Sequence, residues 1–223
     1  MLPTNIHESA WDQKVFGFPC YEIHGFTPES GRWAQQHLGH YTTRVSPLAN
    51  KQLLEQFGFY YCDTLIEPFC PKEQFVAHQN NRASLSKAAA LEDLLQISNQ
   101  AFIFGRFHKD FNLSKTLADQ RYDNWLAQLY NEGKVIGLHF DEKLAGFIAV
   151  DNSHLVLHAM HSEFRGQGIA KFLWSSVCTN LFASGIDEIS SSISATNLAA
   201  VNLYSSLGFK FRNAKDIYHR LTK

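Results

Sequence analysis

One short segment constrains this chain more than any other: a strand-like stretch that runs into a glycine-containing loop and then directly into a helix. The loop reads Arg165-Gly166-Gln167-Gly168-Ile169-Ala170. Glycine lets the backbone approach a ligand closely and adopt conformations that other residues avoid. The helix that follows, predicted over residues 166–183, presents unpaired backbone N–H groups and the positive end of its dipole at this loop. We therefore predict a binding site for a diphosphate group here.

The loop differs from two better-known phosphate-binding loops. The chain contains no GxxxxGK[ST] sequence, which excludes a Walker loop. The spacing R-x-x-G-x-A differs from G-x-G-x-x-G, and the preceding strands are predicted to form hairpins, which argues against a dinucleotide-binding fold. The remaining alternative is that Gly166 and Gly168 only permit a tight turn from strand to helix.

Charge and composition limit the classes of partner. The 20 basic and 21 acidic side chains give a net charge of -1, so the chain has no overall field for nucleic acid or an anionic membrane. A phosphate-bearing ligand must then be held by local features such as the loop. With 45% hydrophobic and 18% charged residues in 223, the sequence predicts a globular protein with a substantial core.

Location and redox state follow from what the sequence lacks. The N-terminus has no basic region followed by an apolar run, and no apolar stretch approaches the ~20 residues of a membrane-spanning helix. The four cysteines form no C-x-x-C pair, so we interpret them as buried free thiols in a reducing compartment. The expected location is cytoplasmic, with no membrane partner.

Residues 1–80 are predicted to form a small N-terminal α/β unit. Thr27 is a natural helix N-cap, and Gly58 is a natural helix end. The predicted strands cover residues 18–25, 41–45 and 59–69, and the predicted helices cover residues 28–38 and 47–57.

Residues 81–223 are predicted to form the larger unit, so the fold class is α/β with a mixed sheet (α+β) and an N-terminal α/β extension. Residues 104–113 form an irregular aromatic and charged piece, FGRFHKDFNL. The predicted helices cover residues 85–102, 116–131, 166–183 and 198–207. The predicted strands cover residues 134–140, 144–150, 154–160, 188–194, 210–212 and 217–221.

A second motif begins 27 residues after the loop. Asn197 starts a predicted helix as its N-cap, and Tyr204 lies two helical turns along the same face, ahead of Gly208-Phe209. Taken alone, these positions favour the simpler interpretation of an ordinary helix cap and an ordinary core tyrosine.

Together, the two motifs resemble those of the GCN5-related N-acetyltransferase (GNAT) superfamily. The resemblance covers residue 85 to the end, through the strand order, R-x-x-G-x-A, and N-x-x-A-x-x-x-Y-x-x-x-G-F. It implies a sheet that splays between the strand ending at Met160 and the strand at residues 188–194, with acetyl-CoA as co-substrate in the splay. The reaction implied is direct attack of an amine on the thioester, without a covalent enzyme intermediate.

The resemblance also implies roles for individual residues. Backbone groups of His158, Ala159 and Met160 would pair with the pantetheine arm, and an N–H near Met160 would stabilise the oxyanion. The loop would hold the pyrophosphate, and Asn197 would contact pantetheine. Tyr204 would face the departing sulfur as a general acid, because a tyrosine hydroxyl is protonated at neutral pH.

The whole chain is similar to the TDP-fucosamine acetyltransferases of bacterial surface-polysaccharide synthesis. That likeness implies a nucleotide-activated amino sugar as the small-molecule acceptor. It rests on Trp11-Asp12, Val15-Phe16-Gly17, Leu54-Glu55-Gln56-Phe57-Gly58-Phe59, Gly105-Arg106-Phe107, Tyr122 and Trp125.

Three residues are candidates for the acceptor side. Asp63 stands where that family more usually has a glutamate that accepts the amine proton through water, and the alternative is a solvated strand end. Glu67 lies four residues on, on the same strand face, and is a substitute candidate. Arg106 is suited to bidentate binding of a diphosphate, and its alternative is a surface arginine in a mobile loop.

Histidines near the loop raise the question of a metal. On a strand, His154 and His158 would lie roughly 13 Å apart, too far for zinc–nitrogen bonds of about 2 Å. We therefore expect no metal site.

Two other functions remain open. The acceptor could be another amine, such as an antibiotic, a polyamine, an amino acid or a protein N-terminus. More remotely, the chain could be a non-catalytic acyl-CoA-binding module, although it keeps both Asn197 and Tyr204. The sequence also leaves open whether the chain forms a homodimer.

Overall fold

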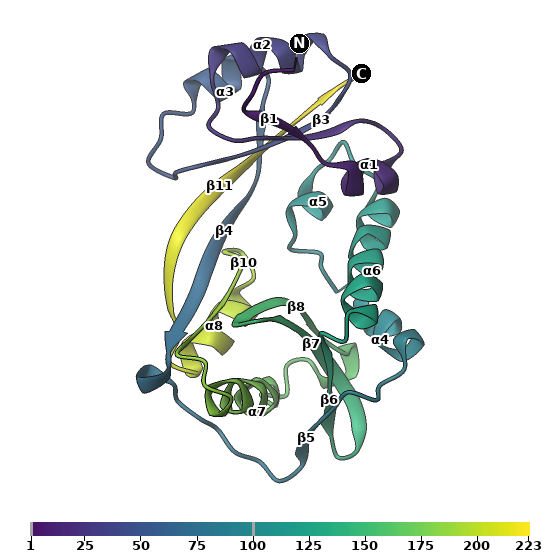
Figure 1. Cartoon of the computed structure of the whole chain (residues 1–223), viewed down its shortest axis with the longest axis vertical. Coiled ribbons are helices and arrows are strands. Elements are labelled where there is room, and N and C mark those ends of the chain that lie inside the picture. The colour runs from purple at the N-terminus through teal and green to yellow at the C-terminus, as the bar shows by residue number, and fades with distance from the viewer. Residues whose placement is uncertain (1, 100) are drawn as a thin grey trace.

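A single mixed sheet runs the length of the molecule in the computed structural model, which describes residues 2–99 and 101–223. The strand order is β1-β2-β3-β11-β4-β9-β8-β7-β6-β5, and β10 pairs with β4 off this path. Figure 1 shows the long strands β4 and β11 running from the N-terminal helices at one end to α7 and α8 at the other. This architecture confirms the predicted α/β fold class with a mixed sheet.

The elements have the following bounds. The strands are β1 (Ile6–Glu8), β2 (Cys20–Ile23), β3 (Gly39–Val45), β4 (Tyr60–Pro71), β5 (Ala83–Ser86), β6 (Val135–Phe140), β7 (Lys143–Asp151), β8 (His154–Met160), β9 (Glu188–Ser191), β10 (Ile193–Ser194) and β11 (Lys210–Thr222). The α-helices are α1 (Ala10–Phe16), α2 (Pro28–Gln36), α3 (Gln52–Gln56), α4 (Leu91–Ser98), α5 (Arg106–Lys109), α6 (Lys115–Asn131), α7 (Ala170–Ala183) and α8 (Leu198–Ser206). Short 3₁₀ turns cover Lys72–Gln74 and Ser162–Phe164.

The sheet opens between β8 and β9, as the resemblance implies. These parallel strands pair only through His154↔Ser190 and Leu155↔Ser191. Farther along, β8 continues beside β7, while β10 turns away to pair with β4. The backbone of residues 156–160 therefore has a strand on one side only, within the described part of the chain.

Glycine explains why one predicted helix starts later than expected. The helix predicted from residue 166 begins at Ala170, because Gly166 and Gly168 have φ angles of 75° and 70°, in the left-handed region. The first four residues of the predicted helix therefore form a loop.

Other local predictions need correction. The two short strands predicted at the C-terminus are one strand, β11, whose register shifts between Arg212 and Lys215 beside Asn213 at φ 54°. The piece predicted as irregular contains the one-turn helix α5. The helix predicted over residues 85–102 is shorter: its first residues lie in β5, α4 ends at Ser98, and residue 100 lies outside the described residues.

The C-terminal strand connects the N-terminal strands with the rest of the sheet. β11 lies between β3 and β4 and is antiparallel to both, with Tyr218 opposite Thr43 on one side and Tyr61 on the other. The largest apolar core contains Trp174 of α7 and Tyr204 of α8, and a separate core packs α2 and α3 against β1, β2, β3 and β11. None of the described helices is both long and apolar enough to cross a membrane.

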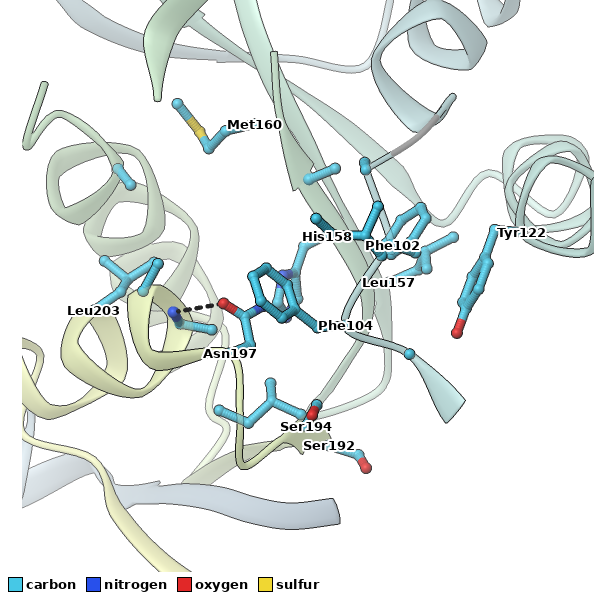
Figure 2. A pocket seen from close by; sticks show the side chains of 18 of the residues that line it. Phe102, Phe104, Tyr122, Leu157, His158, Met160, Ser192, Ser194, Asn197 and Leu203 are labelled. Atoms are coloured by element: carbon cyan, nitrogen blue, oxygen red, sulfur yellow. Dashed lines mark hydrogen bonds between the residues drawn. The ribbon is translucent and has the colours of Figure 1, made fainter. Parts of the chain in front are cut away.

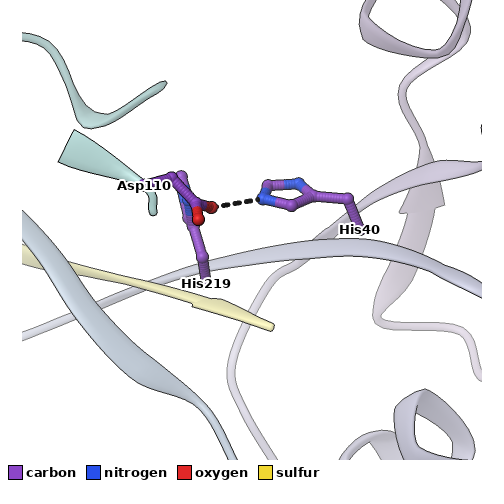
Figure 3. Close-up of side chains that lie close together, drawn as sticks. All are labelled: His40, Asp110 and His219. Atoms are coloured by element: carbon purple, nitrogen blue, oxygen red, sulfur yellow. Dashed lines mark hydrogen bonds and ion pairs between the residues drawn. The ribbon is translucent and has the colours of Figure 1, made fainter. Parts of the chain in front are cut away.

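A buried carboxylate fastens the N-terminal strands to the segment after α5. Asp110 Oδ2 accepts hydrogen bonds from His40 Nε2 at 3.0 Å and His219 Nδ1 at 2.8 Å (Figure 3). The hydroxyl of Tyr60 and the backbone N–H of Asn112 also donate to Asp110. Although burial opposes ionisation, hydrogen bonds from the two histidines hold the pKa of Asp110 well below its usual range. Burial is the largest effect on His219 and lowers its pKa to about 3.

These groups make the fold sensitive to acid. His219 has a lower pKa in the folded than in the unfolded chain, so the unfolded chain binds more protons as pH falls below about 6.5. Stability is therefore lost on acidification, by about 1–2 kcal/mol between pH 7 and pH 5 from this group. Urea unfolding at pH 7, 6 and 5 should show a shallower pH dependence for His219→Gln than for the wild type. The exposed histidine variant His7→Gln should match the wild-type slope. Equal slopes for all three proteins would contradict this account.

Candidate active site

A cavity of about 490 Å³ lies where β8 and β9 separate. Its walls come from β8, the glycine loop, the start of α7, the β10–α8 turn and residues 101–107. In Figure 2, Met160, Leu203 and Asn197 lie on the left of the cavity, and Phe102 and Tyr122 lie on the right. The residues predicted from sequence that line it are Asp63, Arg106, His158, Ala159, Met160, Arg165, Gly166, Gly168, Ala170 and Asn197.

The exposed edge of β8 forms one wall. Beyond Leu155 this edge has no neighbouring strand among the described residues, so its backbone N–H and C=O groups are available to an extended ligand. Amide groups of a pantetheine arm match such an edge, because they can pair with it as an added strand would.

The glycine loop lines the cavity next to the start of α7. A Cβ atom placed on Gly166 or Gly168 would meet no atom within 4 Å, so the space above the loop is open. Helix α7 begins at the end of the loop, and its N-cap residue Ile169 makes no side-chain cap hydrogen bond. Phe172 N donates to the Ile169 carbonyl, whereas the N–H groups of Ala170 and Lys171 have no backbone acceptor among the described residues. Such N–H groups at a helix start are suited to an anion such as a diphosphate.

The loop's side chains are engaged elsewhere. Arg165 Nε donates to the Met160 carbonyl at 2.9 Å, and Gln167 Nε2 donates to the Glu163 carbonyl at 2.5 Å. Gln167 does not line the cavity, nor does Ile169, which is buried in the core. Arg165 is therefore the one charged side chain of the loop on the cavity wall, and the rest of the loop presents mainly backbone to the cavity.

Asn197 caps α8 and lines the cavity. Its Oδ1 accepts a hydrogen bond from Ala200 N at 3.2 Å, as its predicted N-cap position requires (Figure 2). The cap leaves the side-chain NH₂ group of Asn197 free to donate to a ligand.

Tyr204 is coupled to His158. The Tyr204 side chain is completely buried and does not line the cavity, whereas His158 does. The Tyr204 hydroxyl lies 2.9 Å from His158 Nε2. Burial raises the pKa of Tyr204 and lowers the pKa of His158 to about 4, so both groups are neutral at pH 7. The edge of the Trp174 ring packs against the His158 ring, with centroids 5.4 Å apart.

Asp63 lies on the cavity wall and is completely buried, so the alternative of a solvated strand end is wrong. Its Oδ1 accepts hydrogen bonds from Lys109 Nζ at 2.6 Å, Ser194 Oγ at 2.7 Å and Thr64 N at 2.9 Å. Its Oδ2 has no hydrogen-bond partner among the described residues.

Arg106 begins the one-turn helix α5, and its side chain is only 12% exposed. The alternative of a surface arginine in a mobile loop is therefore wrong. Its closest acidic neighbour is Glu22 at 3.5 Å, and its guanidinium lies over the Phe107 ring. Burial, the largest effect, lowers the pKa of Arg106 to about 10, which leaves the side chain charged at pH 7.

Glu67 does not join these groups. It lies off the cavity wall, where its carboxylate accepts from Arg212 Nε at 2.9 Å and Asn213 Nδ2 at 2.7 Å. Asp63 and Arg106 are thus the acceptor-side candidates that the fold brings into the cavity.

One group of described residues has a possible metal-ligand set. His40, Asp110 and His219 offer ligand atoms within 4.8 Å of one another. In this cluster the two ring nitrogens hydrogen-bond directly to Asp110, and Tyr60 and Asn112 donate to the same carboxylate. Hydrogen bonding therefore accounts for the arrangement, which lies outside the cavity. His154 and His158 contact different partners, Ser190 and Tyr204.

Some residues of the site were not identified from the sequence. Lys109 is 46 positions from Asp63, and no spacing rule connects a lysine in an irregular segment with a strand aspartate. The side chain of His158 was missed because only its backbone was assigned a role. The partial signal for Lys109 was the concentration of charged and aromatic residues in FGRFHKDFNL.

Comparisons with solved structures agree with this architecture. A GCN5-related N-acetyltransferase from Sphaerobacter thermophilus has a TM-score of 0.64 at 13% identity, covering 91% of this chain and 72% of its own. A GCN5-related N-acetyltransferase from Kribbella flavida has a TM-score of 0.60 at 10% identity, covering 98% and 88%. A tandem GNAT protein from the clavulanic acid biosynthesis pathway, solved without AcCoA, has a TM-score of 0.57 at 12% identity, covering 92% and 76%. At these identities the likeness establishes the fold.

The family is established by a sequence model. Residues 96–219 match the model of the acetyltransferase (GNAT) domain, which is more than half of the chain. No curated protein matches the chain. The matched residues include the edge of β8, the glycine loop and α8, all of which contribute residues to the cavity wall. The chain belongs to the GNAT family of acetyltransferases, enzymes that use acetyl-CoA.

Proposed function

We propose that this acetyltransferase transfers the acetyl group of acetyl-CoA to the amine of a nucleotide-activated amino sugar resembling TDP-fucosamine, in surface-polysaccharide synthesis. The observation that carries this proposal is the presence of Asp63 and Arg106 in the same cavity as the glycine loop. One is an acceptor for an amine, and the other is a cation for a diphosphate. An amine without an anionic group would leave Arg106 Nε, which is buried and has no partner among the described residues, unsatisfied.

An aromatic wall supports a sugar acceptor. Phe102 and Tyr122 stack with ring centroids 4.4 Å apart, and both line the cavity together with Phe104 and Trp125. Flat aromatic surfaces bury the apolar faces of a sugar ring or a base while their edges stay near polar groups.

The two predicted units can be assigned to the two substrates. We propose that residues 81–223 hold acetyl-CoA and that residues 1–80 support the acceptor side. In support, Asp63 comes from the N-terminal unit, and so does Glu22, the closest acidic neighbour of Arg106.

Bound acetyl-CoA supplies the thioester carbon that the amine attacks. In the proposed mechanism, Asp63 accepts the proton that the attacking amine loses. The backbone N–H near Met160 stabilises the negative charge that develops on the carbonyl oxygen. Glu67 is off the wall, so the proposed base is Asp63 alone.

The proposed acid is Tyr204, and His158 controls its proton. If His158 carries its proton on Nδ1, the Tyr204 hydroxyl must donate to Nε2 and its proton is held by the imidazole. If Nε2 carries the proton, it donates to the hydroxyl oxygen, and the imidazole does not hold the phenolic proton. Because Tyr204 is completely buried behind the cavity wall, the proposed step includes a movement of its side chain toward the cavity before the proton reaches the departing sulfur. We propose the second tautomer, in which His158 orients Tyr204.

A panel of acceptors tests the substrate. We expect thiol release from acetyl-CoA to show its highest kcat/KM with TDP-fucosamine, above UDP-linked amino sugars, spermidine, aminoglycosides and free amino acids. Arg106→Gln should raise KM for the nucleotide sugar about tenfold or more, because the charged hydrogen bonds to the diphosphate are lost. Activity confined to simple amines would contradict the sugar-nucleotide proposal.

Tyr204→Phe tests the proposed acid. Turnover should fall about 100-fold, in the range of general acid–base effects, while the Kd for acetyl-CoA should change less than about threefold. Stopped-flow thiol detection and calorimetry measure the two quantities. Tyr130→Phe, which removes a hydroxyl from a different core cluster, is the matched control and should keep wild-type turnover. Wild-type turnover in Tyr204→Phe would exclude the tyrosine as the acid.

Gly168→Val tests the anion-binding loop. The new side chain would occupy the open space above the loop and strain a backbone at φ 70°. We expect the Kd for acetyl-CoA to rise about 30-fold or more. Gly185→Val is the matched control, because Gly185 also has positive φ and open space but lies beyond the C-terminal end of α7, off the cavity wall. If both variants bind acetyl-CoA like the wild type, the loop does not hold the cofactor.

A further inference from the structure

The two oxygens of the Asp63 carboxylate have different surroundings. Three donors converge on Oδ1, whereas Oδ2 is buried without a hydrogen-bond partner in the described part of the chain. A buried carboxylate oxygen without a donor is unfavourable, so such an atom beside a cavity indicates where a ligand donor is accepted. Asp63 is on the cavity wall.

Lys109 holds the other oxygen. Its Nζ lies 2.6 Å from Asp63 Oδ1, 2.6 Å from Thr196 Oγ1 and 3.1 Å from Ser194 Oγ. Lys109 does not line the cavity, so its ammonium meets the carboxylate outside the space that a substrate would fill. The lysine therefore does not compete with an acceptor amine for Oδ2.

Lys109 supplies a counter-charge and a hydrogen bond to the buried carboxylate of Asp63. Asp63 is completely buried, and a charge in such a place requires a counter-charge and hydrogen bonds. Lys109 is the cation in contact with Asp63 among the described residues. With Oδ1 held by Lys109, Ser194 and the backbone, the carboxylate cannot rotate freely, and Oδ2 keeps one direction.

We propose that Lys109 is a positioning residue for the acceptor amine: it holds Oδ1 of Asp63, so that the carboxylate is turned with Oδ2 toward an N–H of the amine. This inference rests on the proposed function. When the amine attacks, the N–H bond breaks, its electron pair stays on nitrogen, and the proton passes to Oδ2. The single turn of α5 then serves both ends of the acceptor, because Arg106 and Lys109 are three residues apart on it.

A first experiment needs no acceptor. Crystal structures of the wild type and of Lys109→Met compare the orientation of the Asp63 carboxylate. We expect the carboxylate to turn in Lys109→Met, because Oδ1 loses the Lys109 ammonium and keeps only Ser194 Oγ and Thr64 N as donors. An unchanged orientation in Lys109→Met would overturn the proposed role of Lys109.

A second experiment measures coupling with acetyl-CoA and TDP-fucosamine. Asp63→Asn should lower kcat/KM for the acceptor about 100-fold, and Lys109→Met about 10- to 100-fold. In the Asp63→Asn background, Lys109→Met should change kcat/KM less than about threefold, because the lysine acts through the aspartate. Independent, multiplicative effects would overturn the proposal.

Controls separate this role from a structural one. Lys115→Met removes a lysine that donates to the His108 carbonyl of the same helix α5 but does not touch Asp63, and it should keep wild-type kcat/KM. The Kd for acetyl-CoA should stay within about threefold in Lys109→Met, whereas general loosening of the site would raise it. If the wild type acetylates no amine of the panel, the proposed function fails, and the two crystal structures still decide whether Lys109 positions Asp63.

Discussion

The separation of β8 from β9 is the constraint on which the rest of the site depends. Two parallel strands that pair through only two residue pairs leave a row of backbone groups without partners. The chain that diverges from β8 continues from β9 into β10, which pairs with β4. The opening is thus built into the sheet, and the glycine loop, α7 and α8 are arranged around it. The opening offers unused hydrogen-bonding capacity, which is why the proposed reaction is placed there.

Around that opening, buried polar side chains form hydrogen-bonded pairs, and one member of each pair lines the cavity. Asp63 is held by Lys109, and Tyr204 is held by His158. In each pair one member faces the cavity and the other is withdrawn from it. This arrangement reconciles the low polarity of the interior with a reaction that moves protons on both the amine and the sulfur side.

The sequence predicted the parts of the protein that depend on local rules. The glycine loop, the Asn197 cap and the strand at residues 154–160 follow from backbone preferences, and the structure has them in place. The pairing of Lys109 with Asp63 and the one-turn helix α5 could not be predicted, because they depend on tertiary contacts between distant residues. The single strand β11 was missed for a similar reason: pairing with β3 and β4 carries it through a bulge that looks like a break in the sequence.

The position of β11 has a consequence for how the chain acquires its structure. β3 and β4 do not pair with each other, and β11, which lies between them, is synthesised after both. Until β11 is in place, each of the two strands presents an open hydrogen-bonding edge, which can pair with other chains. Pairing of β11 with β4 also joins Phe69 to Lys210, which are 141 positions apart, and such a distant contact slows folding. A nascent chain that lacks β11 is therefore exposed to aggregation at these two edges.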